Sequence, residues 1–596
     1  MDILGISCYY HDAAAVLLRD GMLVAAAEEE RFSRKKHDYR FPERAIDFCL
    51  KQGGIKAGDL DYVVFYEKPL VKFERILTSV LGTYPASYLV FREAMIAWFN
   101  EKLWIRGLMV RKLGVSAEHI LFVEHHLSHA ASALYCSPFE DAAILTIDGV
   151  GEWTTAAMGK GHADWKGSSS TIELGHEIRF PHSLGLLYSA FTAFLGFQVN
   201  EGEYKVMGMA PYGQPKYQDE VYRVVKSFDD GSFQLNMDYF SFTTSTDTTY
   251  SRRFVDLFGQ PRKPESEFYT LTTHPKRDHP HWDDAIAAEN QKYADIAASI
   301  QRVTEDIMLK MAKVAMERSG SKKLCMAGGV ALNSVGNGRI LRELGVEDLF
   351  IQPAAGDSGG ALGAALYVYH VLLGQPRKFV LENAYWGQSY SAAEIQDFLK
   401  EKGAHYEYIA DDAQYTDRIA EALLQGKVVG LFQGRFEWGP RALGNRSILA
   451  DPRRPEMKDL VNAKIKFREP FRPFAPVVLE EKTTDFFQIP NPERHFPARY
   501  MLLVVPIHEE KQSMIGAVNH LGTGRLQTVR KETNPIYYTI TEKFGQATGV
   551  PVVMNTSFNL RGEPIVTSPA NAWWTFTNSG IDVLALDHYL IGKNHI

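Results

Sequence analysis

Alternating runs of apolar and polar residues near the start of the chain predict strands joined by a tight hairpin. The run ILGIS is followed by CYYHD and then by AAVLL and MLVAAA, with Asp20–Gly21 between the last two runs. An Asp-Gly pair between apolar runs is a strong hairpin signal. Around position 144, ILTIDGVGEWTTAAMGKG repeats this plan of strand, polar turn and second strand. Two copies of one unit predict a duplicated α/β lobe with a cleft between the copies.

Beyond residue 285 the pattern changes to helical periodicity, with apolar side chains at Ile296, Ile300, Val303, Ile307, Met311 and Val314. This spacing predicts a helix. The strands KLCMA and DLFIQ follow, and each leads through a glycine-rich loop (GGVALN and GDSGGALG) toward a helix. Strands that end in glycine-rich loops at helix starts are typical of nucleotide-handling α/β folds.

The remaining segments predict how the chain is divided. Residues 228–284 are polar and poorly periodic, which predicts an insertion with long loops, and such loops often contact substrate. Residues 371–390 contain no long periodic segment and are interpreted as a linker. We therefore expect an N-terminal domain over 1–370 and a C-terminal domain over 391–596, the latter with strands such as YMLLVV and GVPVVMN.

Composition narrows the class of protein. The 596 residues are 45% hydrophobic and 23% charged, with a net charge of -7, so a dedicated nucleic-acid binder is disfavoured. The apolar stretch 78–114 is interrupted by charges and predicts packed helices, not a membrane span. The N-terminus does not resemble a signal peptide. The four cysteines form no CxxC pair, which favours a reducing cytoplasm.

One group of side chains predicts a metal site. The segment EHHLSHAASALY follows the strand ILFV, so His125 and His129 are expected one turn apart on one helical face. Asp148 and Asp357 follow strands, where their carboxylates would meet a cleft. Two imidazoles and two carboxylates suit iron, manganese or zinc. The alternative is that the histidines cap and pack the helix and the aspartates form turns.

Glycine-rich loops form a second group. DGVGEW and MAGGVALN place Gly149, Gly328 and Gly329 near strand ends, where a phosphate or ribose can approach the main chain. Asn333 could bond a ribose or a base. The alternative is that these glycines only allow strands and helices to pack tightly.

A third group is cationic. Residues 434–476 hold many arginines and lysines among Gly, Pro and aromatic residues, and Arg441, Arg446, Lys466 and Arg472 belong to this run. Guanidinium groups bind phosphate bidentately, so a small anion is the favoured ligand. The alternative is a solvated basic surface. Ser557 and Asn559 follow the strand GVPVV and could orient a small planar polar group.

Eight segments in this order resemble a known family: EEERFSRKKH, HHLSHAASALY, EYKVMGMAPYG, GGVALN, GDSGGALG, GPRALGNRSILADPR, REPFRPFAP and NTSFNLRGEPIV. The chain resembles, essentially end to end, the O-carbamoyltransferases of the NodU/CmcH family, which modify hydroxyls of natural products. The resemblance implies an α/β fold with a duplicated actin/hexokinase-type (ASKHA) N-terminal domain and a YrdC-like C-terminal domain. It also implies that the C-terminal domain makes carbamoyl-adenylate from carbamoyl phosphate and ATP (with Mg), and that a hydroxyl attacks it beside an Fe(II)-type metal in the N-terminal cleft.

The resemblance also assigns residues. It implies metal ligation by His125, His129, Asp148 and Asp357; a nucleotide cleft at Gly149, Lys205, Gly328, Gly329 and Asn333; a carbamoyl phosphate pocket at Arg441, Arg446, Lys466, Arg472, Ser557 and Asn559; and a transfer centre at His11 and Lys36. A histidine near its ordinary pKa can accept a proton at neutral pH, so His11 is the candidate base and Lys36 would stabilise developing charge. The alternative for His11 is a structural hydrogen bond beside Asp12.

Three other functions share parts of this pattern. Hydrogenase-maturation carbamoyltransferases normally carry zinc-type cysteine pairs, which this sequence lacks. A tRNA threonylcarbamoylation enzyme is disfavoured by the domain order and the acidic charge. A non-catalytic ATP-binding protein on an actin-type fold would leave the arginine-rich segment unexplained. We expect a small hydroxyl-bearing acceptor and neither a nucleic-acid nor a membrane partner; the acceptor and the oligomeric state stay open, a homodimer being one option.

Overall fold

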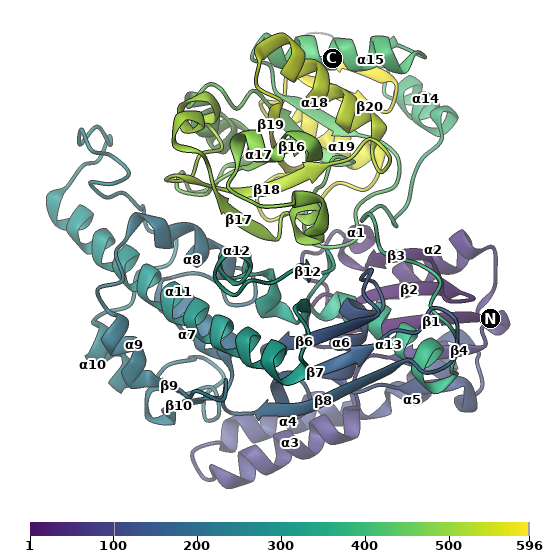
Figure 1. Cartoon of the computed structure of the whole chain (residues 1–596), viewed down its shortest axis with the longest axis vertical. Helices are drawn as coiled ribbons and strands as arrows, with labels where there is room; N and C mark the ends of the chain where they lie inside the picture. Colours follow the sequence, from purple (N-terminus) through teal and green to yellow (C-terminus); the bar gives the residue numbers. More distant parts are fainter. Residues whose placement is uncertain (101, 594–596) are drawn as a thin grey trace.

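The computed structural model describes residues 1–100 and 102–593, and its N-terminal part contains two five-stranded sheets of matching design (Figure 1). The first sheet has the order β3-β2-β1-β4-β5, and the second has the order β12-β11-β6-β7-β8. In each sheet three antiparallel strands are extended by two parallel ones. The duplicated lobe predicted from the sequence repeat is therefore confirmed.

The strands of these sheets agree with the predicted apolar runs. Their bounds are β1 Asp2–Ser7, β2 Ala14–Arg19, β3 Met22–Glu28, β4 Tyr62–Phe65, β5 Ile120–Phe122, β6 Asp141–Ile147, β7 Thr154–His162, β8 Thr171–Arg179, β11 Lys323–Ala327 and β12 Asp348–Phe350. Asp20 and Gly21 form the β2–β3 turn with positive φ angles of 50° and 81°. Two successive positive φ values match the right-handed twist of a hairpin, which explains the Asp-Gly pair.

Two helices fill the space between the sheets. α6 (His125–Leu134) packs against β6 and β11, α13 (Asp357–Tyr367) packs against β1 and β2, and the two helices pack on each other. Gly363 allows this close approach, because a Cβ there would lie 2.8 Å from the carbonyl carbon of Ser128 in α6. The helices α6 and α13 therefore join the two halves of the N-terminal domain.

The other helices of this domain lie around the sheets. Their bounds are α1 Glu30–Ser33, α2 Glu43–Gly53, α3 Pro69–Gly82, α4 Tyr88–Asn100, α5 Ile105–Leu113, α7 Leu184–Phe194, α8 Glu203–Met209, α9 Gln218–Val224, α10 Arg252–Phe258, α11 Asp284–Ser319 and α12 Ser334–Glu343. The predicted helix beyond residue 285 is α11. Within residues 1–100 and 102–593, none of the helices is both long and apolar enough to cross a membrane.

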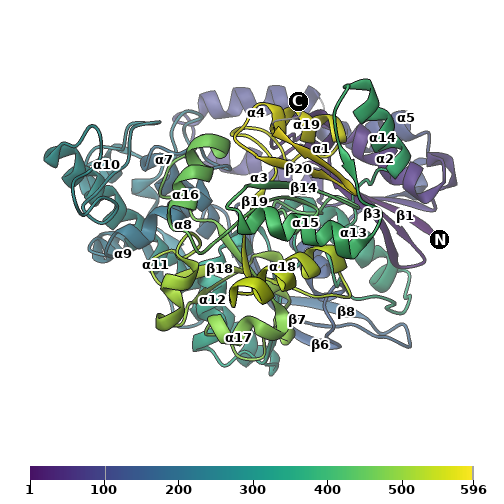
Figure 2. The same cartoon turned by 90° about the horizontal axis from the view of Figure 1, so that it is seen from above.

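Segment 228–284 contains short elements and long loops, as predicted. It holds the strand β10 (Phe233–Leu235), which pairs with β9 (Val225–Ser227), and the helix α10, followed by loop as far as α11. This insertion lies at the edge of the molecule opposite to the N-terminus (Figure 2).

Residues 373–391 form neither a helix nor a regular strand, but they are packed: Phe379, Leu381 and Ala384 are buried. Beyond them, a nine-stranded mixed sheet has the order β13-β21-β20-β14-β15-β19-β16-β18-β17. The bounds are β13 Glu407–Tyr408, β14 Val429–Phe432, β15 Arg446–Ala450, β16 Ala475–Leu479, β17 Leu503–Pro506, β18 Thr523–Val529, β19 Val552–Ser557, β20 Val583–Leu586 and β21 Tyr589–Gly592.

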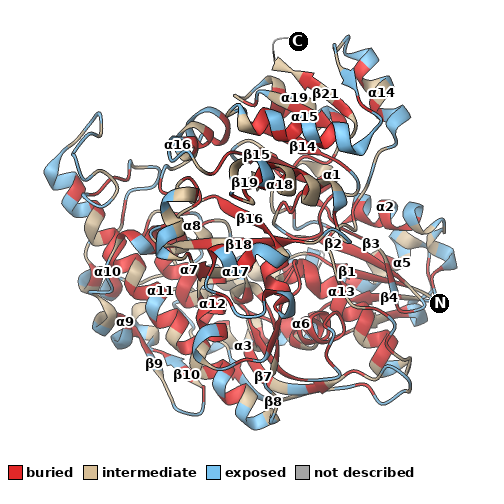
Figure 3. Ribbon diagram, turned by 45° about the horizontal axis from the view of Figure 1, so that its top comes forward, coloured by how far each residue is buried: buried red, intermediate tan, exposed pale blue. Residues whose placement is uncertain are grey.

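Helices cover this sheet. α18 packs on β16 and β19, α15 packs on α18, and α19 packs on β14 and β20. The bounds of the C-terminal helices are α14 Ala392–Glu401, α15 Asp412–Leu424, α16 Glu456–Val461, α17 Thr483–Phe486, α18 Pro535–Thr548 and α19 Pro569–Thr577. The sheets are largely buried and the outer helix faces are exposed (Figure 3).

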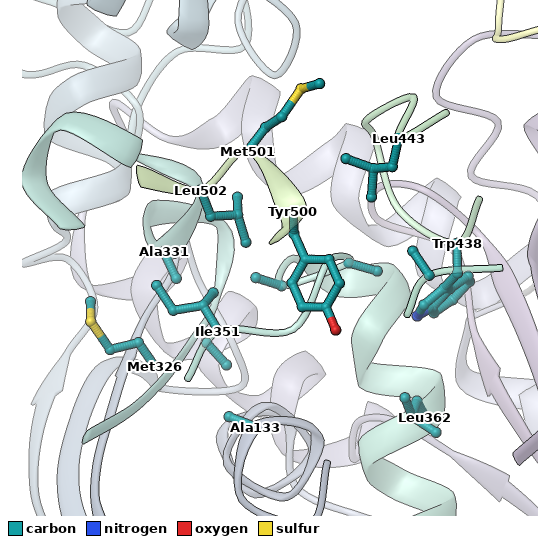
Figure 4. Packing of buried hydrophobic residues seen from close by; sticks show 14 of the residues in the cluster. Ala133, Met326, Ala331, Ile351, Leu362, Trp438, Leu443, Tyr500, Met501 and Leu502 are labelled. Carbon is teal, nitrogen blue, oxygen red and sulfur yellow. The ribbon is translucent and has the colours of Figure 1, made fainter. Parts of the chain in front are cut away.

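The two domains share apolar and hydrogen-bonded contacts. Tyr500 and Leu502 of the C-terminal domain lie near Ile351 and Leu362 of the N-terminal domain (Figure 4). The side-chain amide of Asn337 in the N-terminal domain donates to the carbonyl of Leu502 over 3.0 Å, and the hydroxyl of Tyr500 donates to the carbonyl of Leu381 in the linker over 2.7 Å. Buried contacts of this kind hold the domains in one arrangement.

Candidate functional site

Four predicted metal ligands converge between α6 and α13. His125 and His129 lie one turn apart on α6, Asp148 follows β6, and Asp357 is the first residue of α13. Their donor atoms all lie within 4.8 Å of one another, and all four residues are buried. The Nε2 atom of His125 is 2.9 Å from Asp148 Oδ2 and 3.6 Å from Asp357 Oδ1.

The contacts within this cluster fit a divalent cation. The two Nε2 atoms of His125 and His129 are 3.0 Å apart and face each other, and Asp357 Oδ2 is buried with no hydrogen-bond partner in the described part of the chain. Buried polar atoms normally have partners, so this orphaned oxygen indicates a missing one. Two neutral imidazoles and two carboxylates would satisfy a metal of borderline hardness.

The carboxylates around the cluster favour a positive charge at its centre. Burial opposes a charge on His125, but its hydrogen bond to Asp148 and the carboxylate of Glu67 raise its pKa to about 10. Burial and the neighbouring Asp148 raise the pKa of Asp357 to about 6. Behind His125, Glu67 forms a buried 2.5 Å ion pair with Lys72. This pair could not be predicted from the sequence, because no motif links it to the histidines.

A cavity of about 820 Å³ extends from this cluster to the C-terminal domain. Its walls include most of the predicted site residues: His11, Lys36, Asp148, Gly149, Lys205, Gly329, Asn333, Asp357, Arg441, Lys466, Arg472, Ser557 and Asn559. His125 and His129 lie behind Asp148 and Asp357, and they are not part of the wall. Residues more than 500 positions apart in the sequence thus share one space.

The C-terminal side of the cavity is strongly cationic. Arg441, Arg468, Arg472 and Arg525 all line it. Burial lowers the pKa of Arg525, and the charges of the other three arginines lower it further. The Nε atoms of Arg441 and Arg525 are buried without hydrogen-bond partners in the described residues. Clustered guanidinium groups with unpaired donors are suited to a phosphate or another small anion.

Arg468 and Arg525 were not among the residues assigned above, although both lie in recognisable segments. Arg468 belongs to the basic run, and Arg525 belongs to NHLGTGRLQTVR. A sequence cannot indicate which of many arginines turn inward, because that depends on the packing of β16, β18 and the loop before β16.

Lys466 is fixed by the strand end that carries Ser557 and Asn559. Its Nζ atom donates to the carbonyl of Ser557 over 2.6 Å and to Asn559 Oδ1 over 2.7 Å. Burial and the nearby charges of Arg468 and Arg472 lower the pKa of Lys466. The predicted association of these three residues is present in the structure.

Besides His125 and His129, two assigned residues do not line the cavity. Arg446 is fully buried at the start of β15, stacks on Phe432 and donates to the carbonyl oxygens of Gln433 and Asn445 over 2.6 and 2.9 Å. It therefore holds its own loop, and its assignment to the anion pocket is corrected. The assignment of Gly328 to the nucleotide cleft is corrected as well. Its φ is 95°, and its N–H donates to the carbonyl oxygen of Ala355.

The physical reason for Gly328 is close packing. A Cβ at this position would lie 2.7 Å from the carbonyl carbon of Ile147, so glycine allows the loop to pass β6. The neighbouring Gly329 does line the cavity, but its N–H donates to Asp148 Oδ1 over 2.8 Å. That bond orients a predicted metal ligand and leaves this amide unavailable to a phosphate.

The other residues assigned to a nucleotide cleft line the cavity. Asn333 caps α12 by accepting from the N–H of Gly336, and it also bonds Gln301. Lys205 pairs with Glu469 of the C-terminal domain over 3.1 Å. Gly149 lines the cavity beside Asp148. All three could contact a ligand that spans the domain boundary.

His11 and Lys36 lie at the N-terminal side of the cavity, but His11 is not near its ordinary pKa. Burial opposes its charge, yet Asp12 outweighs burial and raises the pKa of His11 to about 10. Its Nδ1 is 2.8 Å from Asp12 Oδ2, and its Nε2 is 3.0 Å from the carbonyl of Asn200. The expectation of an ordinary pKa is therefore wrong. Lys36 forms an ion pair with Glu201.

Comparison with known protein families identifies the class of enzyme. The family model for the carbamoyltransferase N-terminus matches residues 2–366, and the model for the carbamoyltransferase C-terminus matches residues 420–593. The chain belongs to the carbamoyltransferase family. The predicted resemblance and the assignment as a carbamoyltransferase enzyme are confirmed.

Relatives of this carbamoyltransferase match over nearly its whole length. An uncharacterised protein of Synechocystis sp. is 44% identical, covering 99% of this chain and 96% of the relative. Nodulation protein NolNO of Sinorhizobium fredii is 39% identical, covering 98% of this chain and 79% of the relative.

Solved structures give distant likenesses to part of the chain. HypF of T. kodakarensis matches with a TM-score of 0.29 and 15% identity, over 63% of this chain and 48% of HypF. An activator of 2-hydroxyisocaproyl-CoA dehydratase from Clostridium difficile matches with a TM-score of 0.30 and 15% identity, over 62% of this chain and 94% of the activator. The predicted α/β class with a duplicated N-terminal lobe is confirmed.

Proposed function

We propose that this carbamoyltransferase uses ATP to convert carbamoyl phosphate into carbamoyl-adenylate and transfers the carbamoyl group to a hydroxyl of a small natural product. The observation that carries the proposal is the shared cavity. It has four arginines at its C-terminal end and a buried His/Asp cluster at its N-terminal end. One end is suited to polyanion activation and the other to group transfer.

Activation requires two anions to approach each other. Carbamoyl phosphate and ATP repel each other, and the guanidinium groups of Arg441, Arg472 and Arg525 would offset that repulsion. Few carboxylates neutralise these cations: Arg472 is 3.4 Å from Glu469, which Lys205 also contacts. One water is consumed: it converts carbamoyl phosphate into carbamate and phosphate, the carbamate oxygen forms a bond to the α-phosphorus of ATP, and pyrophosphate leaves, so that carbamoyl-adenylate remains. Mg bound with ATP would screen the triphosphate.

Transfer requires an electrophilic carbamoyl carbon and a dry space. His125, His129, Asp148 and Asp357 would hold a divalent metal, iron by the family resemblance with manganese or zinc as alternatives, and such an ion polarises a carbonyl or phosphoryl oxygen when bound. Gly329 holds Asp148 by its N–H, and the buried Glu67–Lys72 pair lies behind His125. These contacts would keep the ligands in place.

The size of the cavity supports a small acceptor. A volume of about 820 Å³ could hold a nucleotide together with a compact alcohol but not a folded nucleic acid. Five relatives carry nodulation names, and the family resemblance implies natural-product acceptors. A cytoplasmic location fits the supply of ATP and carbamoyl phosphate.

The test is carbamoyl phosphate-dependent exchange of labelled pyrophosphate into ATP by the full chain, with no acceptor present. We expect exchange only when carbamoyl phosphate is added. Sugars, aminocyclitols, macrolides and alkaloid alcohols, screened with labelled carbamoyl phosphate, should then identify the acceptor. No exchange under any metal condition would overturn the adenylate route.

A further inference from the structure

Asp12 bridges two imidazoles in the wall of the cavity. Its Oδ2 atom is 2.8 Å from His11 Nδ1, and its Oδ1 atom is 2.8 Å from His37 Nδ1. The two rings are 4.7 Å apart, and all three residues line the cavity. A carboxylate only accepts hydrogen bonds, so both Nδ1 atoms carry a hydrogen. The Nε2 atoms of the two rings then decide how each ring can act.

The Nε2 atom of His11 is also a hydrogen-bond donor. This atom is 3.0 Å from the carbonyl oxygen of Asn200, which also only accepts. Both nitrogens of His11 therefore carry hydrogens, and the ring is an imidazolium. The raised pKa of His11 agrees with this geometry. In this arrangement His11 has no lone pair with which to accept a proton.

His37, in contrast, has a ring nitrogen that can accept a proton. Its Nδ1 donates to Asp12, and its Nε2 is buried with no hydrogen-bond partner in the described part of the chain. A neutral ring with this tautomer has a lone pair on Nε2. An Asp–His pair of this kind is how a carboxylate orients a general base.

The backbone holds this pair in an uncommon conformation. His37 has a φ of 54° and Asp12 a φ of 38°, both in the left-handed region that disfavours non-glycine residues. The N–H of His37 donates to Glu30 Oε2 over 2.9 Å. Such conformations persist where surrounding contacts enforce them, and they cluster at functional sites.

We propose that His37 is the general base for the acceptor hydroxyl, that Asp12 is its positioning residue, and that His11 acts as a cationic hydrogen-bond donor. This inference rests on the proposed function. The acceptor oxygen forms a bond to the carbamoyl carbon while its proton passes to His37 Nε2. The bond from that carbon to the adenylate oxygen breaks, and AMP leaves with the electron pair. The proton then passes to solvent.

The test compares two nucleophiles in the full chain with ATP, carbamoyl phosphate and metal. One is the alcohol found by the acceptor panel, or water if the panel yields none; the other is hydroxylamine, whose nitrogen lone pair attacks before any proton is lost. General bases contribute about 100- to 10,000-fold. For His37→Asn and His37→Gln we expect transfer to oxygen to fall at least 100-fold, with transfer to hydroxylamine and pyrophosphate exchange kept.

The pH profile supplies a second measurement. The wild-type rate for the oxygen nucleophile should fall on acidification, and His37→Asn should lose this limb while His11→Asn keeps it. The charged and titratable groups that contact or act on His37 are Asp12, His11, Lys36, Glu30 and Glu201. The exposed His405 gives the matched control His405→Asn, which should behave as wild type.

Three results would overturn the proposal. They are an unchanged oxygen-transfer rate in both His37 variants, an equal loss for oxygen and hydroxylamine, and a second metal equivalent that disappears with His37. The third matters because His11, Asp12 and His37 also have the spacing of metal ligands. Missing pyrophosphate exchange in the wild type would instead contradict the proposed function.

Discussion

The contact between α6 and α13 allows a direct test of how the fold builds the candidate metal site. We consider Gly363→Ala. The new Cβ would lie 2.8 Å from Ser128 C and from Ser132 N of α6, with the carbonyl oxygen of Ser128 nearer still. α6 carries two of the candidate ligands and α13 begins with a third, so separating these helices moves the ligands apart.

The size of the effect follows from these distances. The carbonyl oxygen of Ser128 is the nearest atom, so restoring an ordinary contact requires the helices to move apart by more than about 1 Å. Overpacking of this kind costs about 1–3 kcal/mol of unfolding free energy. Metal ligand distances tolerate only about 0.2 Å, so the cluster should lose at least one ligand. We expect metal affinity to fall at least about 10-fold.

The assay combines metal content by mass spectrometry after loading with Fe(II), urea unfolding, and carbamoyl phosphate-dependent pyrophosphate exchange. Gly363→Ala should lose metal and stability but keep exchange, because the arginines lie in the other domain. Gly82→Ala is the control: Gly82 ends α3, and an added Cβ there meets no neighbouring side chain within 4 Å among the described residues. Stoichiometric metal and an unchanged unfolding midpoint in Gly363→Ala would refute the view that this helix contact positions the ligands.

Three further predictions separate the roles of other residues. Arg441→Ala should abolish pyrophosphate exchange, whereas His125→Ala should spare exchange and stop transfer; equal loss of exchange in both variants would contradict the division into two sites. Arg446→Ala should lower the unfolding free energy by about 3 kcal/mol, because the buried carbonyl groups that Arg446 contacts lose their donors. Arg441→Ala should not destabilise the chain, because it removes one of several clustered cations. Urea titrations of the two variants test this difference. Burial lowers the pKa of His370 to about 4, so on acidification the unfolded chain binds a proton at this residue before the folded chain does. The unfolding free energy should therefore fall by up to about 3 kcal/mol between pH 6.5 and 4. In urea titrations across this range, His370→Gln should reduce this dependence of the unfolding free energy on pH.

Local patterns determined much of the fold. The Asp20–Gly21 turn, the repeat of strand and hairpin, and the helix beyond residue 285 could all be predicted, because each depends on neighbours in the sequence. The types of residue at the metal cluster were also predictable, since His125 and His129 must share a face once α6 forms. Asp148 and Asp357 were predicted because each follows an apolar strand, and the family resemblance implied the same four ligands.

The roles of individual polar side chains were harder to predict. Arg441 and Arg446 belong to one motif, yet Arg441 faces the cavity and Arg446 is buried under its own loop. Gly328 and Gly329 are adjacent, yet only Gly329 lines the cavity. Composition and spacing do not distinguish these pairs, because orientation depends on which surface the neighbouring strand covers.

The sequence by itself determined the duplicated α/β plan, the cationic C-terminal segment and the membership of a carbamoyl-transferring family. Tertiary structure alone decided that α6 and α13 bring four ligands together, that arginines from separate strands and loops face one cavity, and that Asp12 links His11 to His37. The physical reason is how far apart in the chain the interacting residues lie. Hydrogen bonds and side-chain periodicity act between near neighbours, whereas burial, charge pairing and protonation depend on groups that only long-range packing brings within a few ångströms.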